Sequence, residues 1–407
     1  MRISLLLALA ACHDETPGDA RVFDARTARI ASIADANNAF AFDLLEATRA
    51  DEPDNLFYSP FSVSSALGMT YGGAGGETAQ QLHDVLHVGL DDAEFHDTLG
   101  AYTNDLGGEH GRAYTLAVAN RLFAQEGYPL QPDFVSLTSD TYSAPVQPVD
   151  FIADPDGSRD AVNDWVADQT HDTIDTLLPP GSISPDTRLV LANAIYFLGD
   201  WTQAFDRSST RDAVFHAPSG DRTVPMMSGN PAGEEALLTS FDADFSMVRL
   251  PYQGDQVSML LLIPVDSTTP LAAIEPELDA TRLQALVDAL QPAYDLTVQL
   301  PRFELRTAIE LSPALKSLGM TDAFDFHRAD FSNISGTDDL ALSGVNHEAF
   351  VSVDEHGTEA AGGTGAAVAT VQSLSSTPLF KADRPFLFVI RDDLTGTVLF
   401  VGRLVEP

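Results

Sequence analysis

The sequence predicts an α+β fold in which helices pack on large antiparallel sheets. Helical patterns concentrate in the first half of the chain, and strand patterns concentrate in the second half. Two pairs of apolar runs flank short turns, Met247–Pro251 with Gln256–Pro264, and Pro385–Ile390 with Thr397–Val401. Runs joined by such short turns form hairpins, so this distribution favours an α+β architecture.

The helices expected in the first half have recognisable starts and stops. Apolar residues recur at helical spacing from Ile33 to Leu45, which predicts the first helix. Ser59 followed by Pro60 indicates a second helix start, because the hydroxyl can cap it and the proline fits its first turn. Gly72-Gly73 ends that helix. Further helices are expected at Glu77–Leu86 and Asp160–Thr170.

Three longer segments are expected to be strands. Tyr114–Phe123 alternates polar and apolar residues, as a half-buried strand does. Thr187–Phe197 is apolar enough for a strand buried on both faces. Gly344–Glu355 is a third strand candidate. With no Pro, Gly or Ser linker dividing its 407 residues, the chain reads as one large folded domain.

The composition is very acidic. Asp and Glu number 60 against 22 Lys and Arg, which gives a formal net charge of −38. The only lysines are Lys316 and Lys381. Such a surface excludes nucleic acid, heparin-like polymers and anionic membranes as expected partners, because all of them are polyanions. It is typical of a solvated acidic shell, which a salty medium would screen.

The N-terminus resembles a bacterial lipoprotein signal. A charged start and a short apolar run end in Leu9-Ala10-Ala11-Cys12, and Cys12 is the only cysteine. We therefore expect residues 1–11 to be a signal peptide, 12–32 a lipidated tether and 33–407 the folded domain. The protein would be exported and anchored in the periplasm or at the cell surface. An ordinary secretory leader, giving a free extracellular protein, or a misplaced start codon remains the alternative.

The segment from Glu355 to Pro378 has an unusual composition. It contains no Lys, no Arg and no large aromatic residue, and it lies between two predicted strands. At a period of two, one face would carry only small uncharged residues: Thr358, Ala360, Gly362, Thr364, Ala366 and Val368. Such a segment can remain exposed as a loop or enter a sheet as an added strand, since it has no proline before Pro378 and buries no charge on that face.

These residues resemble the reactive-centre loop of the serpins, the serine protease inhibitor family. The family's hinge motif is matched by Glu355, Gly357, Thr358, Glu359, Ala360 and Ala361, followed by Gly362 and Gly363. Three other segments resemble serpin motifs as well: Asn55–Gln81, Leu191–Trp201 and Arg384–Pro407. Only about the first thirty residues lie outside the resemblance.

The resemblance implies a serpin fold with a reactive-centre loop at about 355–380. It implies suicide-substrate inhibition of a serine endopeptidase, in which the cut loop inserts into the main sheet and the protease stays bound in a covalent 1:1 acyl complex. Family spacing from Glu355 places the scissile bond at Val371-Gln372, which suits elastase-like enzymes. Spacing back from Pro385 gives Leu374-Ser375, which suits chymotrypsin-like or subtilisin-like enzymes. A non-inhibitory serpin, acting as a binding protein or a decoy substrate, is the alternative.

The resemblance also assigns two groups of supporting residues. Ser59, Ser62, Asn193 and His347 match a polar cluster beneath the main sheet that governs how readily its strands part. Trp201 and Arg302 match positions that support the hinge, with Arg302 paired to Glu355. We expect this ion pair to lie at the surface, where it would contribute about 1 kcal/mol at most.

No enzyme chemistry is expected. The glycine-rich stretches lack the Lys-Ser/Thr pair of a phosphate-binding loop, and no Gly-x-Ser-x-Gly motif is present. His83, His87 and His96 lie close in sequence but lack a clear ligand set, so we expect no metal and no cofactor. The predicted protein is a monomeric inhibitor whose partner is the target protease.

Overall fold

The computed structural model describes residues 28–49, 54–107, 112–337, 339–358 and 378–407. Ten helices are described in these ranges. They are α1 (Ala28–Ala47), α2 (Pro60–Tyr71), α3 (Gly76–Val85), α4 (Asp92–Gly107), α5 (Pro132–Ser136), α6 (Pro155–Gln169), α7 (Leu271–Ile274), α8 (Ala280–Asp288), α9 (Ser312–Ser317) and α10 (Ser332–Ser335). No helix within them has the length and apolar character that a bilayer crossing needs.

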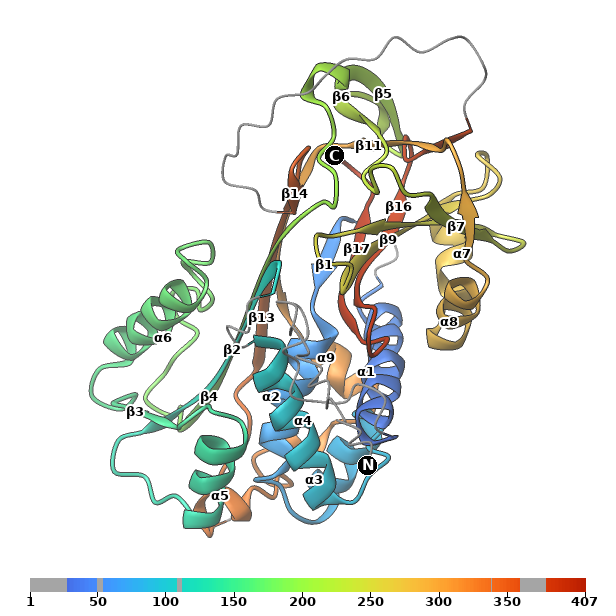
Figure 1. Ribbon diagram of the computed structural model, residues 1–407. Coiled ribbons are helices and arrows are strands. Elements are labelled where there is room, and N and C mark those ends of the chain that lie inside the picture. Colours follow the sequence, from blue (N-terminus) through green and yellow to red (C-terminus); the bar gives the residue numbers. More distant parts are fainter. Residues whose placement is uncertain (1–27, 50–53, 108–111, 338, 359–377) are drawn as a thin grey trace, which may run out of the picture.

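Three sheets build the molecule (Figure 1). The main sheet has the order β12 (Phe303–Glu310), β13 (Val345–Val353), β14 (Gly357–Thr358), β4 (Leu189–Asp200), β2 (Tyr114–Gln125) and β3 (Gln147–Val149). The seven-stranded sheet, antiparallel throughout, has the order β1 (Leu56–Tyr58), β17 (Val398–Leu404), β16 (Phe386–Asp392), β9 (Val257–Pro264), β8 (Phe245–Pro251), β7 (Leu237–Phe241) and β10 (Gln291–Ala293). The four-stranded sheet has the order β15 (Leu379–Lys381), β11 (Thr297–Pro301), β6 (Gly220–Gly229) and β5 (Arg211–Ala217).

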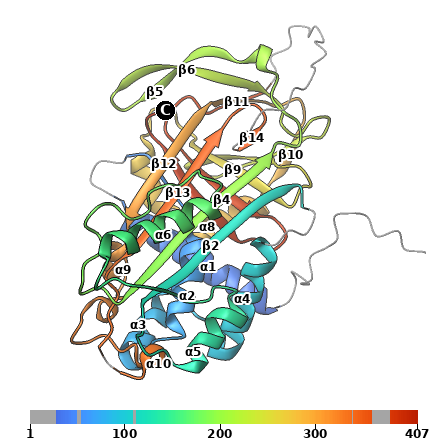
Figure 2. The same cartoon turned by 90° about the vertical axis from the view of Figure 1, so that its left-hand side faces the viewer.

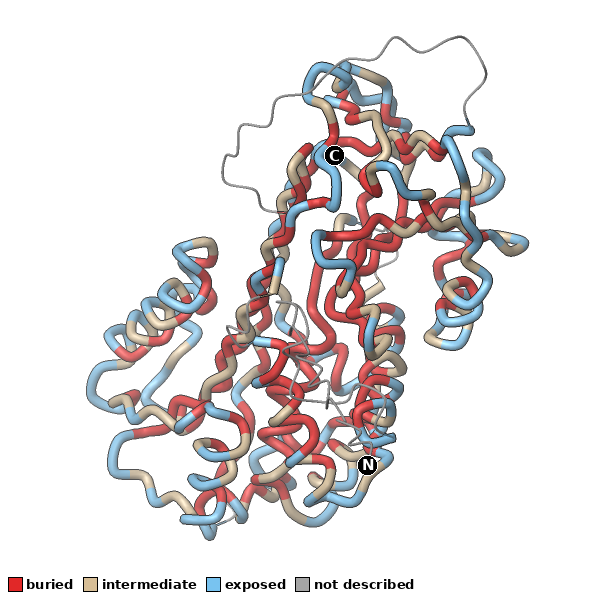
Figure 3. Tube along the Cα trace, viewed as in Figure 1, coloured by how far each residue is buried: buried red, intermediate tan, exposed pale blue. Residues whose placement is uncertain are grey.

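Helices cover the main sheet on both faces. On one face α2 contacts β2 and β4 and also reaches β17 of the seven-stranded sheet, so it lies between the two sheets. On the other face α6 packs across β2 and β4 (Figure 2). Between α6 and this face of the sheet lies a small second core around Phe123, Val162 and Val190. The large core lies on the other side of the main sheet, and the buried segments that form it are red in Figure 3. The predicted α+β class is therefore confirmed.

The elements begin and end close to the predicted positions. The Ser59 hydroxyl accepts a hydrogen bond from the Ser62 N–H at the start of α2, and that helix ends at Gly72, as its flanking residues predict. β4 is buried on both faces through most of its length, as its apolar run predicts. Two helix starts differ: α1 begins at Ala28 and buries Ile30, and α6 begins at Pro155, five residues before the predicted Asp160. Residues 28–32, assigned to the tether, are thus part of the helix.

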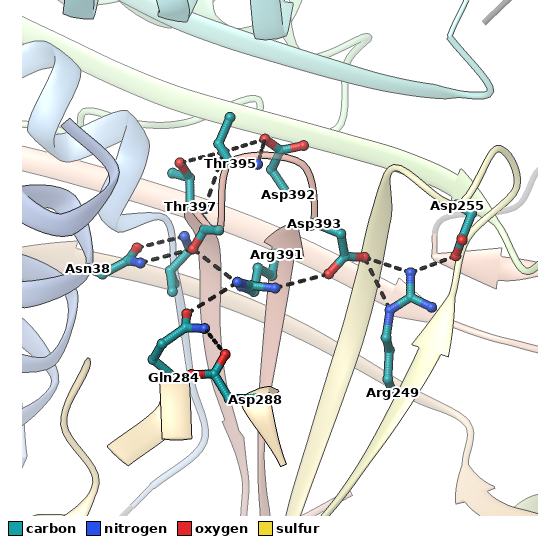
Figure 4. A network of polar contacts seen from close by, with 12 residues as sticks. Asn38, Arg249, Asp255, Gln284, Asp288, Arg391, Asp392, Asp393, Thr395 and Thr397 are labelled. Carbon is teal, nitrogen blue, oxygen red and sulfur yellow. Dashed lines mark hydrogen bonds and ion pairs between the residues drawn. The ribbon is translucent and has the colours of Figure 1, made fainter. Parts of the chain in front are cut away.

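The turn of the β16–β17 hairpin is held by buried polar groups (Figure 4). Asp392 is fully buried and accepts from Thr395. Asp393 lies between Arg249, at 2.9 Å, and Arg391, at 3.3 Å. Burial raises the pKa of Asp393, and the two guanidinium groups oppose that shift. The carboxylates of Asp392 and Asp393 in this turn are therefore paired with neighbouring side chains.

Candidate functional site

The carboxylate of Glu355 is buried at the top of the main sheet. Its side chain is 1% exposed, whereas that of Arg302 is 41% exposed. Arg302 Nε donates to both carboxylate oxygens at 2.9 and 2.8 Å, and its Nη2 lies 2.5 Å from Oε1. The Thr210 hydroxyl donates to Oε1 at 2.5 Å. The predicted pair therefore exists, but the expectation of a surface ion pair was wrong for Glu355, because its carboxylate is buried and also accepts from Thr210.

The electrostatics of Glu355 follow from this burial. Burial raises the pKa of its carboxyl, but the hydrogen bonds from Arg302 and Thr210 outweigh it and hold the pKa below the usual 4.5. A carboxyl with a depressed pKa contributes stability above its unfolded-state pKa. That contribution is lost as the pH falls through the folded-state value.

We expect Arg302→Ala to lower the free energy of unfolding by about 1–3 kcal/mol at neutral pH, because it leaves a buried carboxylate with one hydroxyl as side-chain donor. The variant should also lose less stability than the parent when the pH is lowered below about 4.5. Denaturant unfolding at both pH values measures this. Arg222→Ala is the control, since its pair with Glu406 is exposed on both sides and should change stability by less than about 0.5 kcal/mol. Equal effects of the two substitutions on stability would contradict the conclusion that Arg302 stabilises a buried Glu355 carboxylate.

Trp201 fixes the turn that precedes the hinge strand. Its indole Nε1 donates to the Asp354 carbonyl at 3.0 Å, and its backbone N–H donates to the His356 carbonyl at 2.8 Å. The ring stacks on Tyr252 with centroids 4.7 Å apart. Trp201 thus holds the backbone on both sides of Glu355, at the position that the sequence assigned to it.

The hinge residues Gly357 and Thr358 already form a strand, β14, between β13 and β4. Thr358 pairs with Val353 of β13 and with Gly199 of β4, both antiparallel. A Cβ on Gly357 would lie 2.0 Å from the Gly199 carbonyl oxygen, so only glycine fits there. Thr358 is 1% exposed. The register that places Thr358 on the inward face agrees with the structure.

Tyr252 completes the hinge and was missed by sequence reasoning. Its hydroxyl lies 2.6 Å from the Thr358 hydroxyl, and both groups are buried. The sequence placed Tyr252 in a hairpin turn, where a tyrosine gives no signal of a distant partner. Below the hinge, β13 and β4 pair directly with each other, in parallel, through Val345–Ala349 and Leu191–Ile195.

The four residues of the predicted polar cluster meet beneath this parallel pairing. His347 and Asn193 are opposite each other, with Nδ1 and Oδ1 2.5 Å apart. The Ser59 N–H donates to His347 Nε2 at 3.0 Å, so Nδ1 carries the proton and donates to Asn193. Asn193 Nδ2 lies 2.6 Å from the Ser62 hydroxyl. Asn120, which sequence reasoning missed, accepts from the same Nδ2 at 2.5 Å.

The cluster is closed to solvent and is not catalytic. Ser59, Ser62 and Asn193 are 0% exposed and His347 is 1% exposed. Burial lowers the pKa of His347 to about 3, so the imidazole is neutral at physiological pH. The unfolded chain binds this proton near pH 6.5, and the stability that depends on neutral His347 is therefore lost as the pH falls from about 6.5 towards 3.

We expect His347→Ala to lower the free energy of unfolding by about 2–4 kcal/mol, because it leaves the Ser59 N–H and the side-chain oxygen Oδ1 of Asn193 without their partner and opens a cavity. The pH-dependent loss between about 6.5 and 3 should also shrink. Thermal and denaturant unfolding across this range measure both effects. His327→Ala, on an exposed residue, should change stability by less than about 0.5 kcal/mol. If His347→Ala left the free energy of unfolding unchanged, the cluster would not stabilise the closed sheet.

The other histidines considered for metal binding have different partners. His87 lies 2.7 Å from Asp43, and His96 lies 2.8 Å from the Tyr142 hydroxyl. His83 lies 3.2 Å from Asp84. Within the described ranges no three metal-ligating side chains are gathered in one place.

Comparison with known proteins identifies the family. The family model described as "Serpin (serine protease inhibitor)" matches residues 35–407, which is nearly the whole chain. The chain belongs to the serpin family. The serpin fold explains why the hinge, the polar cluster and the C-terminal hairpin occur together in one molecule.

Several curated serpins are similar over most of their length. The leukocyte elastase inhibitor of Bos taurus is 39% identical over 379 residues, covering 91% of this chain and 98% of that protein. Serpin B6 of Pongo abelii is 37% identical over 384 residues, covering 92% and 99%. An uncharacterized serpin-like protein of Methanosarcina acetivorans is 35% identical over 379 residues, covering 92% and 86%. One of these relatives is thus named as an inhibitor of a protease, and the relatives occur in archaea as well as in animals.

Solved structures give the same fold. Native protease nexin-1, crystallised with heparin, has a TM-score of 0.82 at 32% identity, covering 93% of this chain and 100% of that one. The thermophilic serpin tengpin in its native state has a TM-score of 0.82 at 27% identity, covering 92% and 94%. The described part of this serpin therefore has the serpin architecture.

Some predicted site residues lie outside the described residues. These are the lipidation site Cys12, the hinge positions Glu359, Ala360, Ala361, Gly362 and Gly363, and both candidate scissile bonds, Val371-Gln372 and Leu374-Ser375. The assignments of these residues remain predictions.

Proposed function

We propose that this serpin inhibits serine endopeptidases by covalent trapping coupled to loop insertion. The observation that carries the proposal is β14, whose two residues already occupy the space between β13 and β4. The registers of its pairings with β13 and with β4 agree with each other when they are continued along the two strands. Six residues beyond Thr358, Thr364 would lie opposite His347 on β13 and opposite Asn193 on β4, and those two residues are themselves partners.

Insertion would therefore replace one set of pairings with another. The direct β13–β4 contacts at Val345–Ala349 would separate, and the incoming strand would pair with both neighbours. The inward face of the incoming segment would present only small residues from Thr358 to Val368. The His347 cluster lies at the level where the two strands must part, which supports a role for it in controlling sheet opening.

The trapping step follows from acyl-transfer chemistry. The target protease's serine oxygen attacks the carbonyl carbon of Val371, and the amine of Gln372 leaves with a proton from the protease's general acid. An ester then joins the protease to the cut loop. Insertion pulls the ester-linked protease across the sheet and distorts its oxyanion hole and general base, so that hydrolysis of the ester stalls.

Val371 is our proposed bait residue, with Leu374 as the alternative. Both are uncharged, which favours elastase-like or chymotrypsin-like targets over trypsin-like ones. The purified serpin should form an adduct with such an enzyme that survives SDS and has 1:1 stoichiometry, and mass spectrometry of the released C-terminal peptide would locate the cut. Cleavage without an adduct, across several enzymes of both classes and under rapid mixing, would refute inhibition and leave a substrate-like decoy.

We also propose that Cys12 carries a lipid. The support is sequence-based, the apolar run that ends in Leu9-Ala10-Ala11-Cys12. Expression in a bacterium that processes lipoproteins should place the parent in the membrane fraction, whereas Cys12→Ser should be released from it. A parent protein that is soluble with an unmodified N-terminus would exclude the anchor.

A further inference from the structure

A pocket of about 420 Å³ lies at the side of the main sheet, away from the hinge. Its walls come from α2, α4, β2 and α6. Along this part of β2, β4 is the only strand that pairs with Tyr114–Leu122 among the described residues, because β3 pairs with Phe123–Gln125 alone. The pocket thus lies at the edge of β2 that no described strand covers. Helix α6 lies on one face of the sheet beside this edge (Figure 2).

The pocket contains an arginine with no carboxylate partner. Arg121 lies over the Trp165 ring, with its guanidinium carbon 4.7 Å from the ring centroid. The only hydrogen bond described for this guanidinium runs from Nη1 to the Gln147 side-chain oxygen, at 2.8 Å. The Arg121 Nε and the Trp165 Nε1 are both buried donors with no partner among the described residues. Burial lowers the pKa of Arg121, as expected for a cation without a counter-ion.

The remaining polar lining is neutral. Arg121 is the only charged side chain among the described lining residues, and hydroxyl and amide groups come from Thr103, Asn104, Ser143 and Gln169. In a protein with 60 acidic residues, the described lining holds one guanidinium and no carboxylate, which favours a negatively charged ligand. Arg121 is half-buried, and its Nε and the Trp165 Nε1 are buried donors that cost free energy unless a ligand accepts from them.

The size of the pocket indicates an organic ligand. Its volume falls within the range of small-molecule sites, roughly 300–1,000 Å³, and is far larger than an inorganic ion needs. Met69, Val118 and Ala119 supply apolar wall to the pocket. A flat apolar body could therefore lie against these side chains while its charged end reaches the guanidinium.

We propose that this pocket binds a small organic carboxylate, whose oxygens accept hydrogen bonds from Arg121 and Trp165 and whose apolar body lies against Met69 and Val118. A guanidinium recognises a carboxylate with two parallel hydrogen bonds, which gives both affinity and orientation. This site is separate from the reactive-centre loop, and its occupation does not depend on protease inhibition.

Benzoate and benzamide are matched probes for the proposal, because they share a shape and differ in charge. Calorimetry at constant ionic strength should show benzoate binding at least about tenfold tighter than benzamide, since a charge-assisted hydrogen bond is worth about 1.5–3 kcal/mol. Inorganic phosphate, which lacks an apolar body, should bind more weakly than benzoate. Equal affinities of benzoate and benzamide, or no binding of either, would overturn the proposal. Tighter binding of phosphate than of benzoate would overturn the proposal that the ligand is organic.

Variants locate the site. Arg121→Gln should abolish the preference for benzoate, whereas Arg159→Gln should keep it, because Arg159 lies on α6 outside the pocket and pairs with Asp160. Trp165→Phe keeps an aromatic ring but removes the indole donor, so benzoate should bind several-fold more weakly. The protein has two tryptophans, and a benzoate-induced fluorescence change should vanish in this variant because buried Trp201 remains alone. A preference or fluorescence change that persists in these variants would place the ligand elsewhere.

Discussion

Cleavage of the chain within residues 359–377 is expected to raise the melting temperature of this serpin by about 15 °C. Insertion of the freed segment beyond Thr358 would add on the order of a dozen ladder hydrogen bonds, each worth about 1 kcal/mol net, and would bury one apolar face besides. For a domain of this size, each kcal/mol raises the melting temperature by a little more than about 1 °C. Calorimetry of intact and clipped protein measures the difference.

Two comparisons make this test specific. The clipped protein should also resist denaturant concentrations that unfold the intact form, and mass spectrometry should show that both fragments remain together. Clipping at an exposed site outside the loop should not raise the melting temperature, because no strand is gained. Intact and clipped forms that melt at the same temperature would contradict the proposal that the native sheet can accept another strand.

Thr358→Arg is expected to convert the inhibitor into a substrate. Thr358 is buried between β13 and β4 and faces the Tyr252 hydroxyl, so an arginine there would place an unpaired charge on the inward face. In the intact variant we expect β14 to leave the sheet so that the arginine reaches solvent. Insertion would then have to bury that charge, which should cost several kcal/mol and slow insertion while hydrolysis of the acyl-enzyme continues. The number of serpin molecules consumed per protease inhibited should rise at least about tenfold.

Matched variants separate this effect from a general loss of stability. Thr358→Ser keeps a small hydroxyl and should inhibit like the parent. Ala273→Arg introduces the same charge on an exposed helical residue and should also leave the stoichiometry unchanged. Clipped Thr358→Arg should gain less thermal stability than the clipped parent. An unchanged stoichiometry for Thr358→Arg would refute the register in which Thr358 leads the insertion.

Local features of the sequence predicted most of the secondary structure. The cap at Ser59, the proline at Pro60 and the glycines at Gly72-Gly73 bound α2 within a residue, because capping depends on adjacent side chains. The apolar run of β4 and the two hairpins around their turns were predicted for the same reason. The start of α1 was misplaced by five residues, because nothing in residues 28–32 indicates that Ile30 packs into the core.

The partners of the site residues were harder to predict. The family resemblance predicted that Arg302 lies near Glu355 and that His347 lies near Asn193, and the structure places both pairs in contact. Thr210, Tyr252 and Asn120 carry no sequence signal, since each reaches its partner across a separate strand or turn. The burial of Glu355 likewise depends on segments far away in the chain.

The sequence by itself determined the alternation of small residues after Glu355 and the acidity of the surface, because both depend only on residue type and on a period of two. The tertiary structure decided that Glu355 is a buried anion, that Gly357 and Thr358 already separate β13 from β4, and that both strand registers converge on the level of His347 and Asn193. These features arise where strands from distant parts of the chain are brought into one sheet, and their registers are fixed by the packing of that sheet.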